Sequence, residues 1–79
     1  MDDIEKRLTD CFRSVFPELD ITEVSRASAS SVGSWDSIAM LNLISVVEEE
    51  FNVRVPIEEM EQLMSFELIL DFLRRTNAH

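Results

Sequence analysis

The chain has 79 residues, which is enough for one helical domain with a single core. Its 16 acidic and 7 basic side chains give a formal net charge of −9, which disfavours nucleic acids and anionic membranes because both repel such a surface. The one cysteine, Cys11, excludes an internal disulfide, and no stretch has the ~18 consecutive apolar residues that a membrane span needs.

The first predicted helix runs from Asp3 to Val15. Asp2 followed by Glu5 resembles a capping box, and Pro17 ends the helix. The acidic N-terminal sequence is unlike a signal peptide, so we expect a soluble protein of the cytoplasm. The inner stripe of this helix consists of apolar residues that recur at helical spacing: Ile4, Leu8, Cys11, Phe12 and Val15.

A long connection covers residues 17–35 and is rich in serine in its second half. Loops of this length are uncommon in a small domain unless they are functional. The connection has room for a short helical turn. We expect four of its apolar residues to anchor it to the core: Leu19, Ile21, Val24 and Val32.

The second long helix is predicted from Asp36 or Ser37 to Glu50 or Phe51. Asp36 is a favourable N-cap, and its charge suits the positive end of the helix dipole. Apolar residues leave this helix almost no polar face. One interpretation is that the helix is central and buried on most sides.

The other interpretation divides the apolar residues of this helix between two faces. Its core face then consists of Leu43, Val47 and Phe51. A second row lies on the outside, and a contiguous apolar patch at a surface marks an interaction site. This outer row consists of Ile38, Leu41 and Ser45 and ends near Glu48 and Glu49.

The remaining residues predict one extended segment and two helices. Residues 52–56 are extended, because Pro56 keeps Val55 out of the helical region. A short helix covers residues 57–63, and Ser65 caps a last helix from Phe66 to Thr76. The inner face of that last helix is assigned to Leu68, Ile69, Phe72 and Leu73. The predicted fold is all-α: a four-helix bundle with a short third helix and a long loop between the first two helices.

Catalytic and metal sites find little support in the residue types. The only histidine is His79, so a Ser-His-Asp arrangement would depend on the last residue of the chain. No Cys/His cluster has zinc spacing, and no acidic run has the pattern of a calcium loop. Cys11 lies on the core stripe and is interpreted as a small buried hydrophobe. We therefore predict no metal and no enzymatic activity.

Ser37 has two interpretations. A serine near a helix start is frequent, so it can be a purely structural residue. A helix N-terminus also favours negative charge, so a serine there can carry a phosphodiester at little electrostatic cost.

The stretch WDSIAMLNLISVVEEEF resembles the modification site and second helix of acyl carrier proteins. Asp36, Ser37 and Ile38 match the Asp-Ser-Leu pattern of the family, with isoleucine in place of leucine. The acidic run before Phe51 matches the end of that helix, and VRVPIEEM resembles the link to the short third helix. The resemblance covers essentially the whole chain, so we expect a single carrier domain over residues 1–79.

The resemblance implies a covalent cofactor on Ser37. A phosphopantetheinyl transferase would attach 4′-phosphopantetheine from coenzyme A to its hydroxyl, and the thiol of this arm would carry an acyl group as a thioester. Asp36 would orient the site and meet basic groups on the transferase. The carrier itself would be non-catalytic and monomeric.

The same resemblance implies a docking face for partner enzymes, with an apolar centre and an acidic rim: Ile38, Leu41, Ser45, Glu48 and Glu49. Between Asp36 and Asp71 there are nine acidic residues and only Arg54 as a base, a net charge of −8. This charge favours partners with basic patches. The implied partners are the transferase, an acyl- or aminoacyl-loading ligase, and acyl-processing enzymes with basic and apolar docking patches.

Two further positions, in the predicted helix that begins at Asp36 or Ser37, depart from the pattern of fatty-acid carriers. Fatty-acid carriers usually have acids in the first two turns of this helix, where Ala39 and Asn42 stand here. This difference favours a specialised lipid or secondary-metabolite pathway, such as a polyketide one. An aminoacyl or peptidyl carrier remains the alternative, although Asp36 departs from the peptidyl pattern. A helical interaction module without a prosthetic group would differ in that Ser37 stays unmodified.

Overall fold

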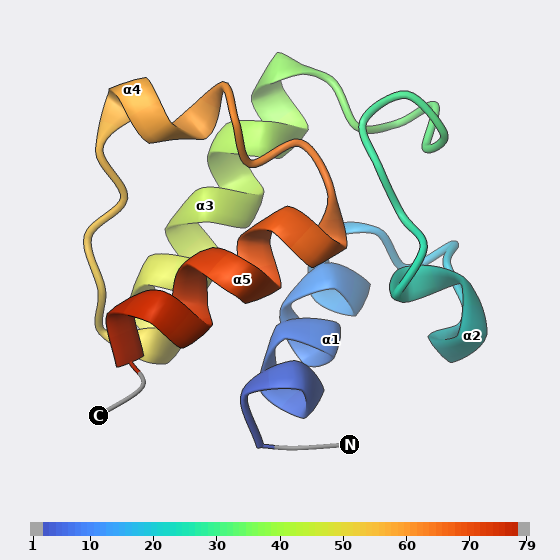
Figure 1. The fold of residues 1–79 in the computed structure, drawn as a ribbon. Coiled ribbons are helices and arrows are strands. Elements are labelled where there is room, and N and C mark those ends of the chain that lie inside the picture. The colour runs from blue at the N-terminus through green and yellow to red at the C-terminus, as the bar shows by residue number, and fades with distance from the viewer. Residues whose placement is uncertain (1–2, 78–79) are drawn as a thin grey trace.

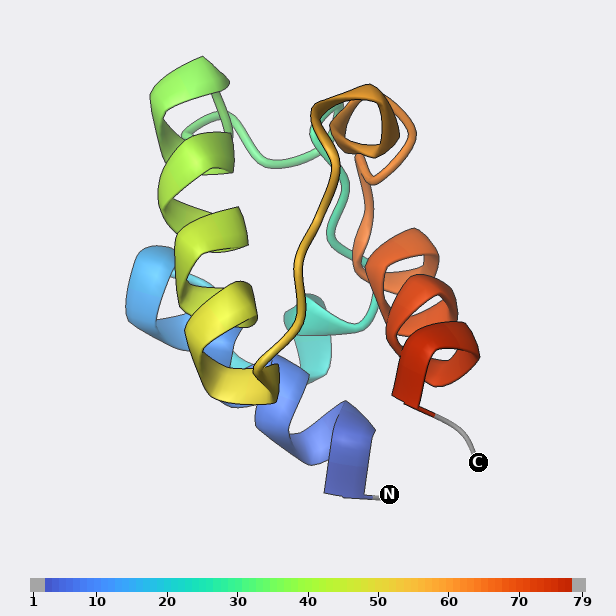
Figure 2. The same ribbon diagram turned by 90° about the vertical axis from the view of Figure 1, so that its left-hand side faces the viewer.

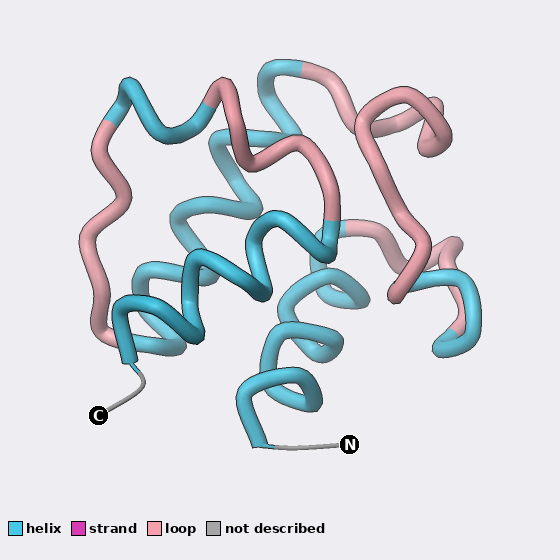
Figure 3. The backbone as a smooth tube through the Cα atoms, viewed as in Figure 1, coloured by secondary structure: helices cyan, strands magenta, loops and turns pink. Residues whose placement is uncertain are grey.

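The computed structural model describes residues 3–77. These residues form five helices and no strand: α1 (Asp3–Val15), α2 (Ile21–Val24), α3 (Ser37–Phe51), α4 (Ile57–Met60) and α5 (Phe66–Asn77) (Figure 1). Figure 3 shows the remaining backbone as loops, with a long one between α2 and α3. The all-α prediction is confirmed. Within the described range, no helix combines the length and the apolar character that crossing a membrane requires.

The predicted helices agree with these bounds, apart from details of the short ones. α1 and α3 fall where the sequence places them, and α2 is the short helical turn for which the long connection has room. α4 ends at Met60 instead of Leu63. Beyond it the Gln62 and Leu63 N–H groups donate to the carbonyls three residues back, as in a turn, and Leu63 is buried. The capping box at Asp2 and the histidine at position 79 lie outside the described residues.

α1 is central to the core and contacts α2, α3 and α5. Its predicted stripe faces inward: Leu8, Cys11 and Phe12 are buried, and Ile4 and Val15 pack partly buried at the edge of the core. The ring of Phe12 lies 5.2 Å from the ring of Phe66 and 5.4 Å from that of Trp35, both edge to face. Such aromatic pairs add about 0.5–1.5 kcal/mol each beyond their buried area.

α3 buries more of its surface than the predicted core face. Leu43, Val47 and Phe51 are buried as expected, and Met40 and Ile44 are buried as well. Ile38 and Leu41 nevertheless remain exposed, by 71% and 59%. The helix is therefore central and also keeps an apolar outer row, so each of the two interpretations holds in part.

Two expected core residues are instead exposed. Leu68 on α5 is 49% exposed, while its neighbour Leu70 is buried. The buried residues Phe66, Ile69, Leu70 and Leu73 follow the i, i+3, i+4, i+7 spacing of one helical stripe, and Leu68 falls outside it. Ile21 is 55% exposed at the first position of α2, whereas Val24 and Val32 anchor the connection as predicted.

The long connection is joined to the segment before α5. Backbone N–H of Ala29 donates to the carbonyl of Met64, and that of Phe66 donates to the carbonyl of Ala27, at 2.8 and 2.9 Å. Figure 2 shows the start of α3 and the α4 segment at the same end of the molecule, away from the start of α1 and the end of α5. This end carries the candidate site.

Candidate functional site

Asp36 caps α3 and leaves Ser37 exposed. The Asp36 backbone is extended (φ −104, ψ −171), its carboxylate accepts a hydrogen bond from the Ala39 N–H at 2.8 Å, and its carbonyl accepts from the Met40 N–H at 2.8 Å. The predicted start and N-cap of this helix are thereby confirmed. Ser37 is the first residue of α3 and is exposed. Because Asp36 supplies the cap, the Ser37 hydroxyl is not required for it.

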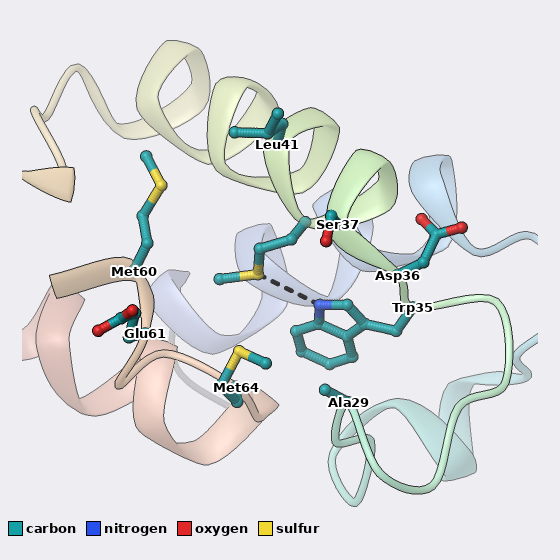
Figure 4. A pocket seen from close by; sticks show the side chains of 9 residues that line it. Ala29, Trp35, Asp36, Ser37, Leu41, Met60, Glu61 and Met64 are labelled. Atoms are coloured by element: carbon teal, nitrogen blue, oxygen red, sulfur yellow. Dashed lines mark hydrogen bonds between the residues drawn. The ribbon is translucent and has the colours of Figure 1, made fainter. Parts of the chain in front are cut away.

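Ser37 lies at the mouth of an open pocket of about 690 Å³. Figure 4 shows its hydroxyl beside the pocket, with the Asp36 carboxylate directed away. Three chain segments supply the walls: the start of α3, the long connection, and the stretch from α4 towards α5. The lining is mostly apolar and consists of Ala29, Trp35, Met40, Leu41, Met60 and Met64, with Asp36, Ser37 and Glu61 as polar members.

Trp35 is held rigidly in the wall of this pocket. It is only 5% exposed, and its ring centroid lies 5.4 Å from that of Phe12 and 5.5 Å from that of Phe16. Its indole N–H donates to the thioether sulfur of Met40 across 3.2 Å, marked by the dashed line in Figure 4. No local pattern marks Trp35 or the methionines as site residues, because Met60 and Met64 come from a segment that only the tertiary fold brings to Trp35 and Met40.

The start of α3 fits the phosphodiester of a 4′-phosphopantetheine group. The Ser37 hydroxyl is accessible, the helix behind it has 15 residues, and its first turn contains no acidic side chain. Negative charge is favoured at such a terminus. The apolar pocket alongside offers a place for an apolar extension of the same group.

The predicted docking residues lie along one side of α3 at helical spacing. Ile38, Leu41, Ser45 and Glu49 are exposed. Glu48 is half-buried, and its carboxylate accepts a hydrogen bond from the Val55 N–H at 2.8 Å. The structure thus brings four of the five residues to one open surface and gives Glu48 a structural bond as well.

The Cys11 thiol and the acidic side chains show no arrangement for catalysis or metal binding within residues 3–77. Burial, with smaller contributions from the charges of Glu50 and Asp10, raises the pKa of the Cys11 thiol to about 11. The thiol therefore stays protonated at neutral pH, in agreement with its interpretation as a small core residue. Within residues 3–77, no three His, Cys, Asp or Glu side chains gather closely enough to hold a metal ion.

Comparison with curated proteins identifies the family. The chain is 42% identical over 65 residues to the acyl carrier protein of Thermosynechococcus vestitus, covering 82% of this chain and 76% of that protein. It is 30% identical over 80 aligned positions to the acyl carrier proteins of two strains of Buchnera aphidicola subsp. Acyrthosiphon pisum, covering 98% of this chain and 96% of those proteins. No protein-family model matches the chain. The chain belongs to the acyl carrier protein family.

Proposed function

We propose that this chain carries acyl groups on a 4′-phosphopantetheine arm attached to the hydroxyl of Ser37. The observation that carries the proposal is the position of Ser37, which is the exposed first residue of α3 at the mouth of an apolar pocket. When bound, the arm supplies a thiol that holds the acyl group as a thioester. Membership of the acyl carrier protein family supports the same role.

The chain presents Ser37 but does not activate it. Asp36 fixes the first turn of α3, and the only histidine of the chain is its last residue. The base must therefore come from a phosphopantetheinyl transferase. In that transfer the Ser37 oxygen forms a bond to the phosphate of coenzyme A, the pyrophosphate bond breaks with release of adenosine bisphosphate, and the transferase takes the hydroxyl proton. The chain acts as a carrier and not as an enzyme.

The outer face of α3 serves as the docking face for the transferase, a loading ligase and acyl-processing enzymes. Ile38 and Leu41 form its apolar centre, and Ser45 and Glu49 continue it towards the acidic end of the helix. Partners with an apolar contact and a basic rim complement this surface. A monomeric state and a cytoplasmic location stay predictions.

The composition of this face supports a specialised pathway. Ile38, Leu41 and Asn42 are exposed in the first two turns, and no acidic side chain stands among them. A partner that recognises this face therefore relies on apolar contacts near Ser37, with charge contributing only further along the helix. Such recognition suits a dedicated lipid or secondary-metabolite enzyme.

An aminoacyl cargo is the second candidate, because Glu61 places a carboxylate among the pocket-lining residues. A carboxylate there can meet the ammonium group of an amino acid. The midpoint of thermal unfolding, measured on the protein with each cargo attached to the arm, separates the two candidates. An octanoyl group that enters the apolar pocket raises the midpoint above that of the arm alone, whereas an alanyl group does so only if the Glu61 carboxylate binds its ammonium group.

The intact mass of the protein tests the proposal. After incubation with coenzyme A and a promiscuous transferase, we expect the mass of one phosphopantetheine to be added to the wild type and to the Ser34→Ala variant, but not to Ser37→Ala. Ser34 is a matched control because it is an exposed serine close to the site. Loading of Ser37→Ala would refute the assignment of the site, and failure of the folded wild type with several transferases would refute the function.

A further inference from the structure

The indole N–H of Trp35 has a weak acceptor as its partner. It donates to the Met40 sulfur at 3.2 Å, and a thioether is a poor acceptor compared with a carbonyl oxygen. A buried indole N–H normally finds a hydrogen-bond partner. The indole N–H is therefore hydrogen-bonded in the free protein, but it would form a stronger hydrogen bond with a carbonyl oxygen.

The indole is more constrained by packing than the methionine side chain to which it is bonded. Trp35 is 5% exposed, and its ring packs against both Phe12 and Phe16. Met40 has an unbranched side chain with three rotatable bonds and packs adaptably. A molecule in the pocket can therefore displace the thioether while the N–H stays in place.

The location of this donor relates it to Ser37. Trp35 stands two residues before Ser37, so their Cα atoms are at most about 7 Å apart. Both residues line the same pocket, and the pocket is otherwise mostly apolar. A group tethered to Ser37 that folds back into the pocket would meet mainly thioether, alkyl and ring surface, with the buried indole N–H as a fixed donor.

We propose that the Trp35 N–H anchors the group tethered to Ser37 by exchanging the Met40 thioether for a carbonyl oxygen of that group. The inference rests on the proposed function and specifies the ligand: an apolar chain with a carbonyl acceptor near its tethered end. The carbonyl belongs to an amide of the arm or to the cargo, and these two sources differ in when the exchange occurs. Trp35 is thus a positioning residue.

The indole N–H resonance tests this exchange directly, because Trp35 is the only tryptophan of the chain. Heteronuclear NMR of the full isotope-labelled chain is recorded in the apo form, with the bare arm, and with octanoyl and β-ketooctanoyl arms. Intact mass verifies loading in each sample. We expect the N–H resonance to move downfield and its exchange with solvent to slow on loading. A change with the bare arm assigns the acceptor to the arm, and a change only with the acyl forms assigns it to the cargo.

Two variants separate the hydrogen bond from general packing. Met40→Leu keeps the volume and removes the competing acceptor, so the indole proton should exchange faster than wild type in the apo form and regain protection on loading. Trp35→Phe keeps an aromatic ring and removes the donor. The octanoyl thioester of that variant should react roughly two- to tenfold faster with hydroxylamine, as expected from the loss of one net hydrogen bond.

The failure of this inference and the failure of the proposed function give different results. An indole resonance that is the same in the apo, arm-bearing and acyl forms, on protein that mass shows to be loaded, would overturn the role of Trp35 and leave the proposed function intact. A folded wild type that accepts no arm would overturn both.

Discussion

The carboxylate of Glu48 accepts a hydrogen bond from the backbone N–H of Val55, with 2.8 Å between the two atoms. The backbone carbonyl of Glu48 also accepts from the N–H groups of Asn52 and Val53. Asn52 has a left-handed conformation (φ 52), which ends α3 and redirects the chain. Glu48 thus holds the exit of the helix through both its backbone and its side chain, and Val55 is buried just beyond it.

Replacing Glu48 with alanine should therefore destabilise the fold, whereas the same change at Glu49 should not. Loss of a charge-assisted bond at a half-buried site is expected to lower the free energy of unfolding by about 1–2 kcal/mol. Glu49 is exposed, and its replacement should stay within about 0.5 kcal/mol of wild type. Urea unfolding measures both, and equal effects would show that the bond to Val55 contributes nothing.

The stability of α3 and its modification depend on different residues, Asp36 and Ser37. Asp36→Ala removes the bond to the Ala39 N–H and should cost about 0.5–2 kcal/mol. Ser37→Ala should cost less than about 0.5 kcal/mol, because its side chain is exposed and does not supply the cap. A larger loss for Ser37→Ala than for Asp36→Ala in denaturant unfolding would contradict this assignment.

Two leucines of α5 provide a matched test of the core. Leu73 is 0% exposed and Leu68 is 49% exposed, within the same helix. Leu73→Ala should destabilise by about 2–5 kcal/mol, and Leu68→Ala by well under half of that. Thermal unfolding ranks the two variants. The opposite order would mean that Leu68, and not Leu73, faces the core.

If the outer face of α3 is a docking face, a substitution there should slow the transferase without destabilising the fold. Leu41→Asp places a charge at the apolar centre, so transfer of the arm by the transferase should slow about tenfold or more. Because Leu41 is 59% exposed, the unfolding midpoint should change little. Leu68→Asp is the control, since it makes the same change at an exposed leucine of α5. Unfolding of Leu41→Asp, or equal slowing by Leu68→Asp, would count against the docking face.

The buried thiol predicts a loss of stability in alkaline solution. The pKa of Cys11 is about 11 in the folded chain and ordinarily 9.0. Between these values the unfolded chain releases a proton that the native chain retains, so rising pH favours the unfolded state. The difference amounts to at most about 2–3 kcal/mol. Cys11→Ala should lack this decline between pH 9 and 11 in unfolding experiments, and a decline of the same size in that variant would assign it to other groups.

The contacts of Arg7 show why part of the fold cannot be predicted from the sequence. Arg7 donates a hydrogen bond to the Glu50 carboxylate, which raises the pKa of its guanidinium. The same guanidinium lies over the ring of Phe51, 4.6 Å from its centroid. These residues are more than 40 positions apart, and no local pattern connects them. Leu68 is a second case: it is 49% exposed while its neighbours Ile69 and Leu70 are buried, and α5 packs against α1. Which of these apolar residues faces the core depends on that packing.

Local sequence patterns predict the three long helices, the cap at Asp36 and the position of Ser37 at a helix start, because periodicity, capping residues and prolines act over a few neighbouring residues. It also indicated the outer row of α3, since Ile38 and Leu41 are offset from the core stripe. The pocket that Trp35 and three methionines form beside Ser37 is visible only in the folded chain. That pocket depends on three segments distant in the chain, and their meeting follows from how the whole core packs.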